Sequence, residues 1–299
     1  MKYTKPYLSI QEQIDLLKSR GMIFGDENRA KSYLINISYY RLSAYCFPYK
    51  NMDSTSEYFI KPISFEHILN IYLFDKEFKL LLFDAIERIK IALRSKMTNS
   101  ISKEFGEYFY KTPSLYSKKD IYNKIDKQIA EQLKRSKEVF IKHYKNKYNE
   151  PKHPPSWIIS EIVSLGTLSN VYRNLKMCDS KKDVSKQFGL NHPKTLESWL
   201  QSITYVRNII AHHSRLWNRT LTIIPVFPKN KLVNDFIINP SSNKSQLYYI
   251  LCTITYLLNE LNPTSSMKMR LKNLIKKYPD LDLTEMGFPD TWINEPLWE

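Results

Sequence analysis

The chain has 299 residues, 42 % of them hydrophobic and 25 % charged, which is ordinary for a globular protein. Its 6 glycines are too few to favour sheets or phosphate-binding loops, and its 3 scattered cysteines exclude a disulfide framework and a zinc knuckle. The formal net charge of +15 attracts polyanions, no apolar run is long enough for a membrane span, and the N-terminus lacks the apolar core of a signal peptide. We therefore expect a helical protein of the reducing cytoplasm.

Short helices are predicted at the start of the chain. Ser9 and Glu12 form a capping box that opens a helix to about Arg20, and Gly21 ends it. Two further helices and a polar loop are predicted over 27–37, 37–45 and 51–62.

A very long helix is predicted from the cap residue Ser64 to about Lys103. A helix of about 40 residues would span about 60 Å, so we expect a kink or a break within it. Apolar residues fall on nearly every side of this helix, which is typical of a central and buried position.

The most basic segment runs from Lys111 to Lys152 and holds 12 Lys or Arg against 5 Asp or Glu. A capping box at Ser117 and Asp120 predicts one helix through it to about Tyr148. Such a segment attracts phosphates, but a solvated helical face explains each Lys run equally well. The candidate RNA-binding residues are Lys134, Arg135, Lys142, Lys145 and Lys147.

Prolines interrupt the chain at 151–155, the only plausible seam in what is otherwise a single domain over 1–299. Pro193 suits the first turn of a helix that runs to about His213, and 223–228 is extended at best. Other helices are predicted near 155–163 and 167–175, from Ser180, and near 245–261 and 265–277, before an irregular tail. The predicted fold is therefore all-α.

The helix from Pro193 carries the candidate catalytic residues. Its apolar side chains gather on one stripe at about 100° per residue, and Arg207 falls within that stripe. A guanidinium there is costly unless it is paired, reaches an interface or lines a site. We predict that Glu87 of the long helix holds Arg207 or orients His212, with pairing inside its own helix, for example to Arg94, as the alternative.

Asn208 and His212 are four residues apart and share the opposite face, where Asn208 can hold the His212 ring. His213 falls at the edge of the apolar stripe, so we expect it to be a structural core residue. A His suits removal of the proton from an RNA 2′-OH, and an Arg neutralises the charge that builds on the phosphate, so no metal is needed. Arg207 and His212 are roughly 140° apart, so we expect two copies about a two-fold axis to complete the site.

The segment 206–219, VRNIIAHHSRLWNR, resembles the signature of the bacterial abortive-infection proteins of the AbiD/AbiF type, in the HEPN superfamily. Its Arg, four residues, His spacing is that of HEPN proteins. Further stretches resemble that family in the same order along nearly the whole chain, at 11–45, 86–95, 160–169 and 286–298. Leu165 stands where the family usually has Phe.

The resemblance implies a HEPN-type helical bundle, with 64–103 and 193–214 as core helices and additional N-terminal and C-terminal helices. It implies a metal-independent endoribonuclease that acts in phage defence or as a toxin on host or phage RNA, without a cofactor. It implies catalytic roles for Arg207 and His212, and a small non-coding RNA that restrains the protein is a further implied partner. The supporting residues of the predicted site are Asn208, Glu87, His213 and Arg94. The alternative is a non-catalytic RNA-binding or infection-sensing module, in which the basic segment carries the function.

Overall fold

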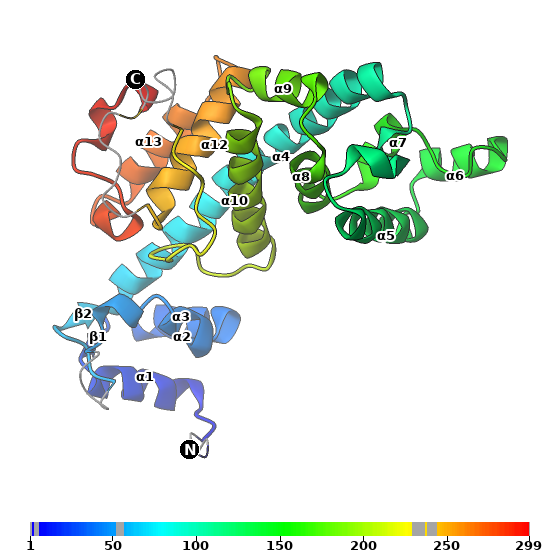
Figure 1. Cartoon of the computed structure of the whole chain (residues 1–299). Coiled ribbons are helices and arrows are strands. Elements are labelled where there is room, and N and C mark those ends of the chain that lie inside the picture. The colour runs from blue at the N-terminus through cyan, green and yellow to red at the C-terminus, as the bar shows by residue number, and fades with distance from the viewer. Residues whose placement is uncertain (1, 3–5, 52–56, 229–236, 238–243, 299) are drawn as a thin grey trace.

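One unbroken helix organises the molecule. In this computed structural model, α4 runs over 41 residues, Phe65–Phe105, and joins the N-terminal helices to the far end of the other helices (Figure 1). The expected break is absent, because no Pro or Gly interrupts α4 and other helices pack along its length. As predicted, the Ser64 hydroxyl caps its start, accepting from the His67 amide at 3.1 Å.

The structure describes residues 2, 6–51, 57–228, 237 and 244–298, so 52–56 of the predicted polar loop lie outside the described residues. The other helices are α1 (Ile10–Ser19), α2 (Glu27–Ile37), α3 (Tyr39–Ser43), α5 (Lys119–Arg135), α6 (Val139–Lys147), α7 (Ser156–Ile162), α8 (Leu165–Asn174), α9 (Asp179–Lys186), α10 (Pro193–Ala211), α12 (Leu247–Leu261) and α13 (Met267–Lys277). Single 3-10 turns lie at Phe47–Tyr49, Phe109–Lys111, Pro113–Leu115, Leu283–Met286, Trp292–Asn294 and Pro296–Trp298. The strands β1 (Met22–Ile23) and β2 (Ile63–Ser64) form one short parallel pair in the described part of the chain. The prediction of an all-α fold is confirmed.

The N-terminal lobe, which we define as residues 6–51 and 57–64, lies below the other helices in Figure 1 and packs against the start of α4. Its first helix begins as predicted, because the Ser9 hydroxyl accepts from the Glu12 amide at 3.4 Å and the Glu12 carboxylate accepts from the Ser9 amide at 2.6 Å. The lobe places α3 beside α4, close to the end of α10.

The remaining helices form a body in which α10 is central. It packs against α4, α8, α9 and α12, while α13 covers a further side of α4 (Figure 1). Trp199, Leu200 and Ile203 of α10 are fully buried in this body. Their burial fixes the rotation of α10 about its axis, and so decides which of its polar residues face outward.

The predicted basic helix consists of two helices, which corrects the expectation from sequence. α5 ends at Arg135, the backbone of 136–138 is extended, and α6 begins at Val139. α5 buries Ile129 and Leu133 on the body, whereas α6 projects from it at the right of Figure 1. The break lies where the chain changes from a helix packed on the body to a helix that projects from it.

Two predicted helix ends also shift. The capping box at Ser117 is absent, because the Ser117 amide is bonded to the Asn174 carbonyl at 2.9 Å and Lys118 precedes α5 without a side-chain cap. At its other end, α10 stops at Ala211 rather than at His213.

Candidate active site and basic surface

The end of α10 decides where its histidines lie. The His213 amide bonds to the Ile210 carbonyl at 2.9 Å, and the next amide bonds to the Ile209 carbonyl at 3.0 Å. These two bonds make a Schellman helix end, in which the residue after the cap takes a left-handed conformation. His213 occupies that position with a φ of 54°, where glycine is the usual residue.

The expectation that His213 belongs to the core is wrong. Its side chain is exposed, because the left-handed backbone takes it off the helical repeat that buries Ile203 and Ile210. The backbone of His213 is held instead of its ring: the Arg41 guanidinium of α3 donates to the His213 carbonyl at 2.7 Å. The N-terminal lobe thus fixes the end of α10.

Asn208 and His212 are both exposed and share one side of α10, as the spacing indicates. The His212 amide bonds to the Asn208 carbonyl at 3.0 Å, within the last helical turn. The Asn208 side chain accepts from Arg207 Nη1 at 3.3 Å, and no hydrogen bond joins it to the His212 ring in the described structure.

Arg207 is half-buried at the edge of the apolar stripe. Within the described residues its guanidinium forms no ion pair, and Glu87 is exposed on α4 without reaching it. Arg94 pairs with Glu161 of α7 at 2.9 Å rather than with Glu87. The structure therefore brings Arg94 to a carboxylate but leaves the predicted Glu87–Arg207 pair unformed.

The charge of Arg207 acts on Lys90, a neighbouring residue of α4. It lies half-buried on α4, and burial, reinforced by the charges of Arg94 and Arg207, lowers the pKa of its ammonium group. The opposing effects of Glu161 and Glu87 do not cancel this. Arg94 and Arg207 therefore both lie close enough to Lys90 to act on its charge.

A cavity of about 620 Å³ opens between α3, α4 and α10, and we call it the α10 cavity. It is lined by Arg41, Tyr72, Lys76, Lys79, Leu80, Phe83, Arg207, Ile210, Ala211 and His213. No Asp or Glu lies among these described lining residues. One chain therefore brings Arg207 and His213 to the same cavity, whereas His212 is not part of its lining.

Asp75 of α4, which the sequence interpretation missed, fixes the chain just beyond the histidines. It is 1 % exposed and accepts from the amides of Leu216 and Trp217 at 3.2 and 2.8 Å and from the Tyr45 hydroxyl at 2.6 Å. Lys79 pairs with it at 3.0 Å. Burial, followed by the Asp75 charge, raises the pKa of Tyr45, which keeps its hydroxyl a donor. An Asp flanked by Tyr72, Phe74 and Phe78 in the long helix was the available signal for this role.

Other residues after the histidines are also anchors. Glu285 of the C-terminal tail accepts from the Trp217 indole at 2.9 Å and from the Asn218 side-chain amide at 3.3 Å. The Arg215 guanidinium donates to the Ala44 carbonyl at 2.7 Å. The second half of the signature segment therefore docks the end of α10 onto the N-terminal lobe and the tail.

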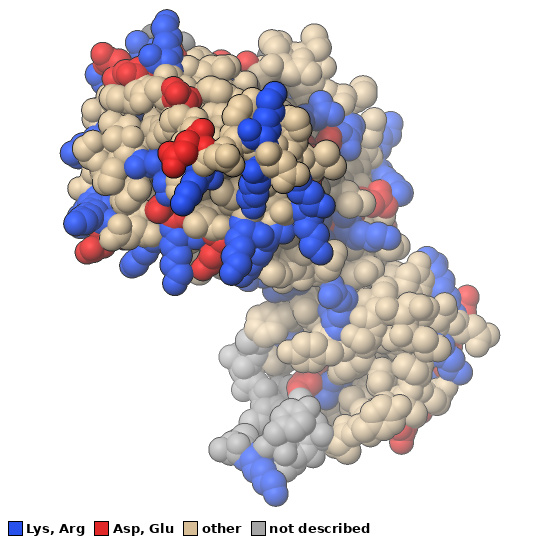
Figure 2. All heavy atoms as spheres, turned by 90° about the vertical axis from the view of Figure 1, so that its right-hand side faces the viewer, with Lys and Arg blue, Asp and Glu red and all other residues tan. Residues whose placement is uncertain are grey.

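The predicted RNA-binding side chains all lie exposed on α5 and α6. The face that looks right in Figure 1 is turned to the viewer in Figure 2, where Lys and Arg side chains outnumber Asp and Glu. α6 itself contains Lys142, Lys145 and Lys147 and no acidic residue, and it buries only Ile141 and Tyr144.

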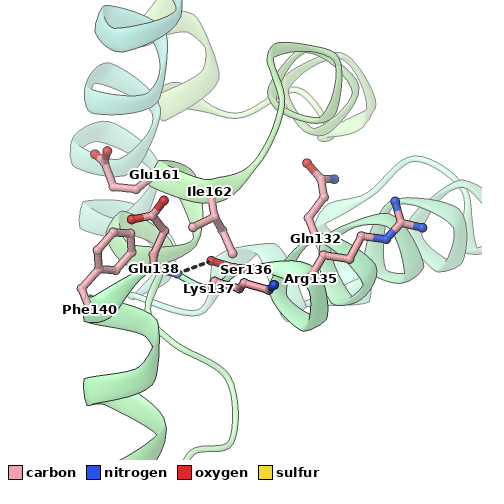
Figure 3. A pocket seen from close by; sticks show the side chains of 8 residues that line it. All are labelled: Gln132, Arg135, Ser136, Lys137, Glu138, Phe140, Glu161 and Ile162. Atoms are coloured by element: carbon pink, nitrogen blue, oxygen red, sulfur yellow. Dashed lines mark hydrogen bonds between the residues drawn. The ribbon is translucent and has the colours of Figure 1, made fainter.

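A second cavity of about 590 Å³ lies where α5 gives way to α6. Figure 3 shows Glu138 and Glu161 on the side of Phe140, with Gln132 and Arg135 on the side of α5. Because carboxylates line it as well as cations, this cavity is less suited to an anion than the α10 cavity.

Among the described residues, no cluster of His, Cys, Asp and Glu has the geometry to hold a metal ion, and the cysteines are free thiols. None of the described helices combines the length and the apolar character that a bilayer span requires.

Comparison with known protein families gives a match. The family model described as Abi-like protein matches residues 32–218, which include α10 and the segment that Asp75 anchors. No curated protein and no solved structure matches the chain.

Proposed function

This chain belongs to the Abi-like protein family, which supports a role in phage defence, and from that premise we propose that it is a metal-independent endoribonuclease. The observation that carries the proposal is Arg207, a half-buried guanidinium without an ion pair among the described residues, in a cavity that no carboxylate lines. A bound anion would stabilise this half-buried positive charge, which has no carboxylate beside it in the cavity. The planar fork of Arg fits the oxygens of a phosphate.

The proposed reaction needs one base, one cation and no other reagent. The base takes the proton of the 2′-OH, the 2′-oxygen forms a bond to the adjacent phosphorus, and the bond from phosphorus to the 5′-oxygen breaks. The 5′-oxygen takes a proton back from the protonated base, directly or through water, and leaves as a 5′-OH, and the other product ends in a 2′,3′-cyclic phosphate. Arg207 neutralises the charge that builds on the phosphoryl oxygens.

His212 is the proposed base, as in the family pattern, and its place outside the α10 cavity favours a composite site. Two copies packed about a two-fold axis place Arg207 of one chain opposite His212 of the other. His213 offers a different solution, because it lines the same cavity as Arg207 of its own chain. The two histidines therefore distinguish a shared site from a site within one chain.

The test is cleavage of a defined RNA by purified His212→Ala, His213→Ala and Arg207→Ala proteins, with EDTA present. We expect Arg207→Ala and His212→Ala to lose activity by about a hundredfold or more, and the parent products to carry 5′-OH ends. Full activity in folded His212→Ala with loss in His213→Ala would move the base to His213. Cleavage by the parent only with Mg²⁺, or no loss in any of the three variants, would refute the mechanism.

RNA binding without cleavage is the second candidate function. It is favoured by α6, which projects from the body and contains three Lys and no acidic residue. Under this alternative Lys142, Lys145 and Lys147 carry the phenotype and Arg207 is structural. Changing the three lysines to Gln removes about three phosphate contacts, so the slope of log affinity against log salt should fall by about 2 for single-stranded RNA. Exposed lysines of other helices, Lys186, Lys194 and Lys276, supply a matched triple Gln control.

The two functions give opposite results in cells. If growth arrest survives His212→Ala and Arg207→Ala but is lost in the α6 triple variant, binding is the function. If it is lost in the first two and the RNA affinity of His212→Ala is unchanged, cleavage is the function.

A further inference from the structure

The α10 cavity has two chemically different walls. Arg41 of α3, Lys76 of α4 and Arg207 of α10 form a cationic wall. Leu80 and Phe83 form an apolar wall that reaches the surface, with 62 % and 40 % of each residue exposed. Large exposed apolar side chains beside a cationic recess are typical of a binding site rather than of an inert surface.

The spacing of the chain produces this arrangement. Lys76, Leu80 and Phe83 follow the i, i+4, i+7 repeat, so one face of α4 presents them in a row along the cavity. Arg207 and Ile210 share a face of α10 by the same rule. The cationic and apolar groups therefore come from regular helices, which position side chains more precisely than loops do.

The cationic wall is not neutralised by the protein. Asp75 pairs with Lys79, another lining residue, and so cancels that charge only. In the described part of the chain, none of the three cations of the wall is in an ion pair. Arg41 uses one N–H on the His213 carbonyl and Arg207 uses one on Asn208, which leaves further donors of each for a ligand.

We propose that the α10 cavity is a nucleotide subsite. A phosphate lies among Arg41, Lys76 and Arg207, and the attached base lies against the Phe83 ring. The cavity volume of about 620 Å³ falls within the roughly 300–1,000 Å³ of small-molecule sites. A base reaches Phe83 only when it is unstacked and unpaired, so the subsite selects single-stranded RNA.

This inference rests on the proposed function and extends it by naming Arg41, Lys76 and Phe83 as groups that hold the nucleotide attached to the scissile phosphate, whose oxygens Arg207 contacts. A second copy of the chain, which brings its His212 to the mouth of the cavity in the proposed composite site, is a poorer occupant of the cationic wall itself. The chain has a net charge of +15, and a cationic wall needs an acidic surface to complement it.

Binding of three small probes to the 299-residue chain tests the subsite by isothermal titration calorimetry. Adenosine 5′-monophosphate carries both recognised groups, inorganic phosphate carries only the anion, and adenosine carries only the base. We expect the monophosphate to bind at least about tenfold more tightly than either fragment, since stacking and charge pairing both contribute.

Variants assign the two walls. Lys76→Ala and Arg41→Ala should each weaken binding of the monophosphate by about tenfold and leave the affinity for adenosine unchanged. Phe83→Ala should weaken binding of the monophosphate and of adenosine by about tenfold each and leave the affinity for inorganic phosphate unchanged.

Matched controls come from the same chain. Lys194 is exposed near the other end of α10, about 20 Å from Arg207, and Lys194→Ala should have less than about a twofold effect. Phe47, at 53 % exposure, is the aromatic control, and Phe47→Ala should leave all three affinities unchanged.

Equal binding of inorganic phosphate and the monophosphate, or no effect of Phe83→Ala, would overturn the inference. So would a Phe83→Ala protein that dissociates from dimer to monomer while its nucleotide affinity is unchanged, because a second copy would then occupy the wall. RNA cleavage without nucleotide binding would refute the subsite alone. Nucleotide binding without RNA cleavage would refute the proposed endoribonuclease and leave the subsite in place.

Discussion

Asp75 shows how one buried carboxylate controls the course of the chain at the candidate site. Its two oxygens accept hydrogen bonds from two backbone amides and from the Tyr45 hydroxyl, and they form an ion pair with the Lys79 ammonium group. A buried ion pair adds little net stability compared with an apolar pair, but breaking it from one side leaves an uncompensated charge. The value of Asp75 is therefore in placing residues 216–217, and through them the end of α10.

Asp75→Asn should lower the free energy of unfolding by about 3–5 kcal/mol, because Lys79 is left buried without its carboxylate. Urea unfolding followed by circular dichroism measures this. Asp84→Asn is the matched control: Asp84 pairs with Arg270 at 2.6 Å on the surface, so its loss should cost less than about 1 kcal/mol. Equal losses for the two variants would contradict the role given to Asp75.

His213 makes an independent prediction at the same scale. Its φ of 54° is costly for a residue with a Cβ, so His213→Gly should raise the free energy of unfolding by about 0.5–1 kcal/mol. Thermal and urea unfolding check the direction, and His212→Gly, at a φ of −86°, should instead be neutral or destabilising. A destabilised His213→Gly protein would mean that the exposed ring makes contacts that offset the backbone strain.

Residues on one helix were predictable from sequence, and partners on different helices were not. The spacing placed Asn208 and His212 on one face of α10 and Arg207 on another, because the helical repeat depends only on the local chain. The contact of Arg41 with the His213 carbonyl spans 172 positions, and no local pattern contains it. The exposed ring of His213 was missed because a left-handed residue breaks the repeat on which the prediction was based.

At the scale of elements, α13 is held to α4 by charged contacts whose strength depends on pH. Lys277 and the Tyr278 hydroxyl donate to Glu77 at 2.7 and 2.8 Å. Burial alone would raise the pKa of Glu77, but these hydrogen bonds and the Lys277 charge outweigh it and hold the pKa below its ordinary value of 4.5. Asp84 behaves in the same way through Arg270 and Arg88, with a pKa below its ordinary value of 3.8.

A carboxylate with a lowered pKa in the folded state stabilises it at all pH values above the unfolded pKa, and the contribution is lost as the pH falls through the folded pKa. We therefore expect the urea midpoint to fall as the pH decreases below about 4.5. Glu77→Gln should reduce this dependence and leave a smaller part due to Asp84. Because both groups are over one third exposed, solvent screens the effect and it should be modest. If the urea midpoint of Glu77→Gln depended on pH as strongly as that of the parent, the Glu77 contacts would not be the source of the pH dependence.

Most helices were predictable as elements, and their exact ends were less so. Ser9, Ser64 and Pro193 act through their own backbone neighbours, and the structure has each of them where the sequence predicts a helix start. The break at 136–138 has no Pro or Gly to announce it. Nothing in the local sequence shows that α5 packs on the body while α6 leaves it.

At the scale of the whole molecule, the proposed composite site makes a prediction about mixed copies. Arg207→Ala and His212→Ala proteins should each be inactive alone. When unfolded and refolded together, half of the dimers are mixed and each mixed dimer keeps one intact site, so about a quarter of parent activity should return. RNA cleavage by the mixture measures this, with two preparations of the same variant as the control. No recovery in a mixture shown to contain mixed dimers would place the site within one chain.

The anchoring of Trp217 and Asn218 by Glu285 has a consequence for the time at which the protein becomes active. A chain is made from its N-terminus, so α10 leaves the ribosome well before residue 285 does. Until then the segment behind the histidines lacks its anchor on the tail. Under the endoribonuclease function proposed above, the chain is synthesised beside messenger and ribosomal RNA that it is able to cut. Under that proposal, the end of α10 gains its anchor on Glu285 only after residue 285 has been synthesised, so the site is incomplete while α10 is still close to the ribosome.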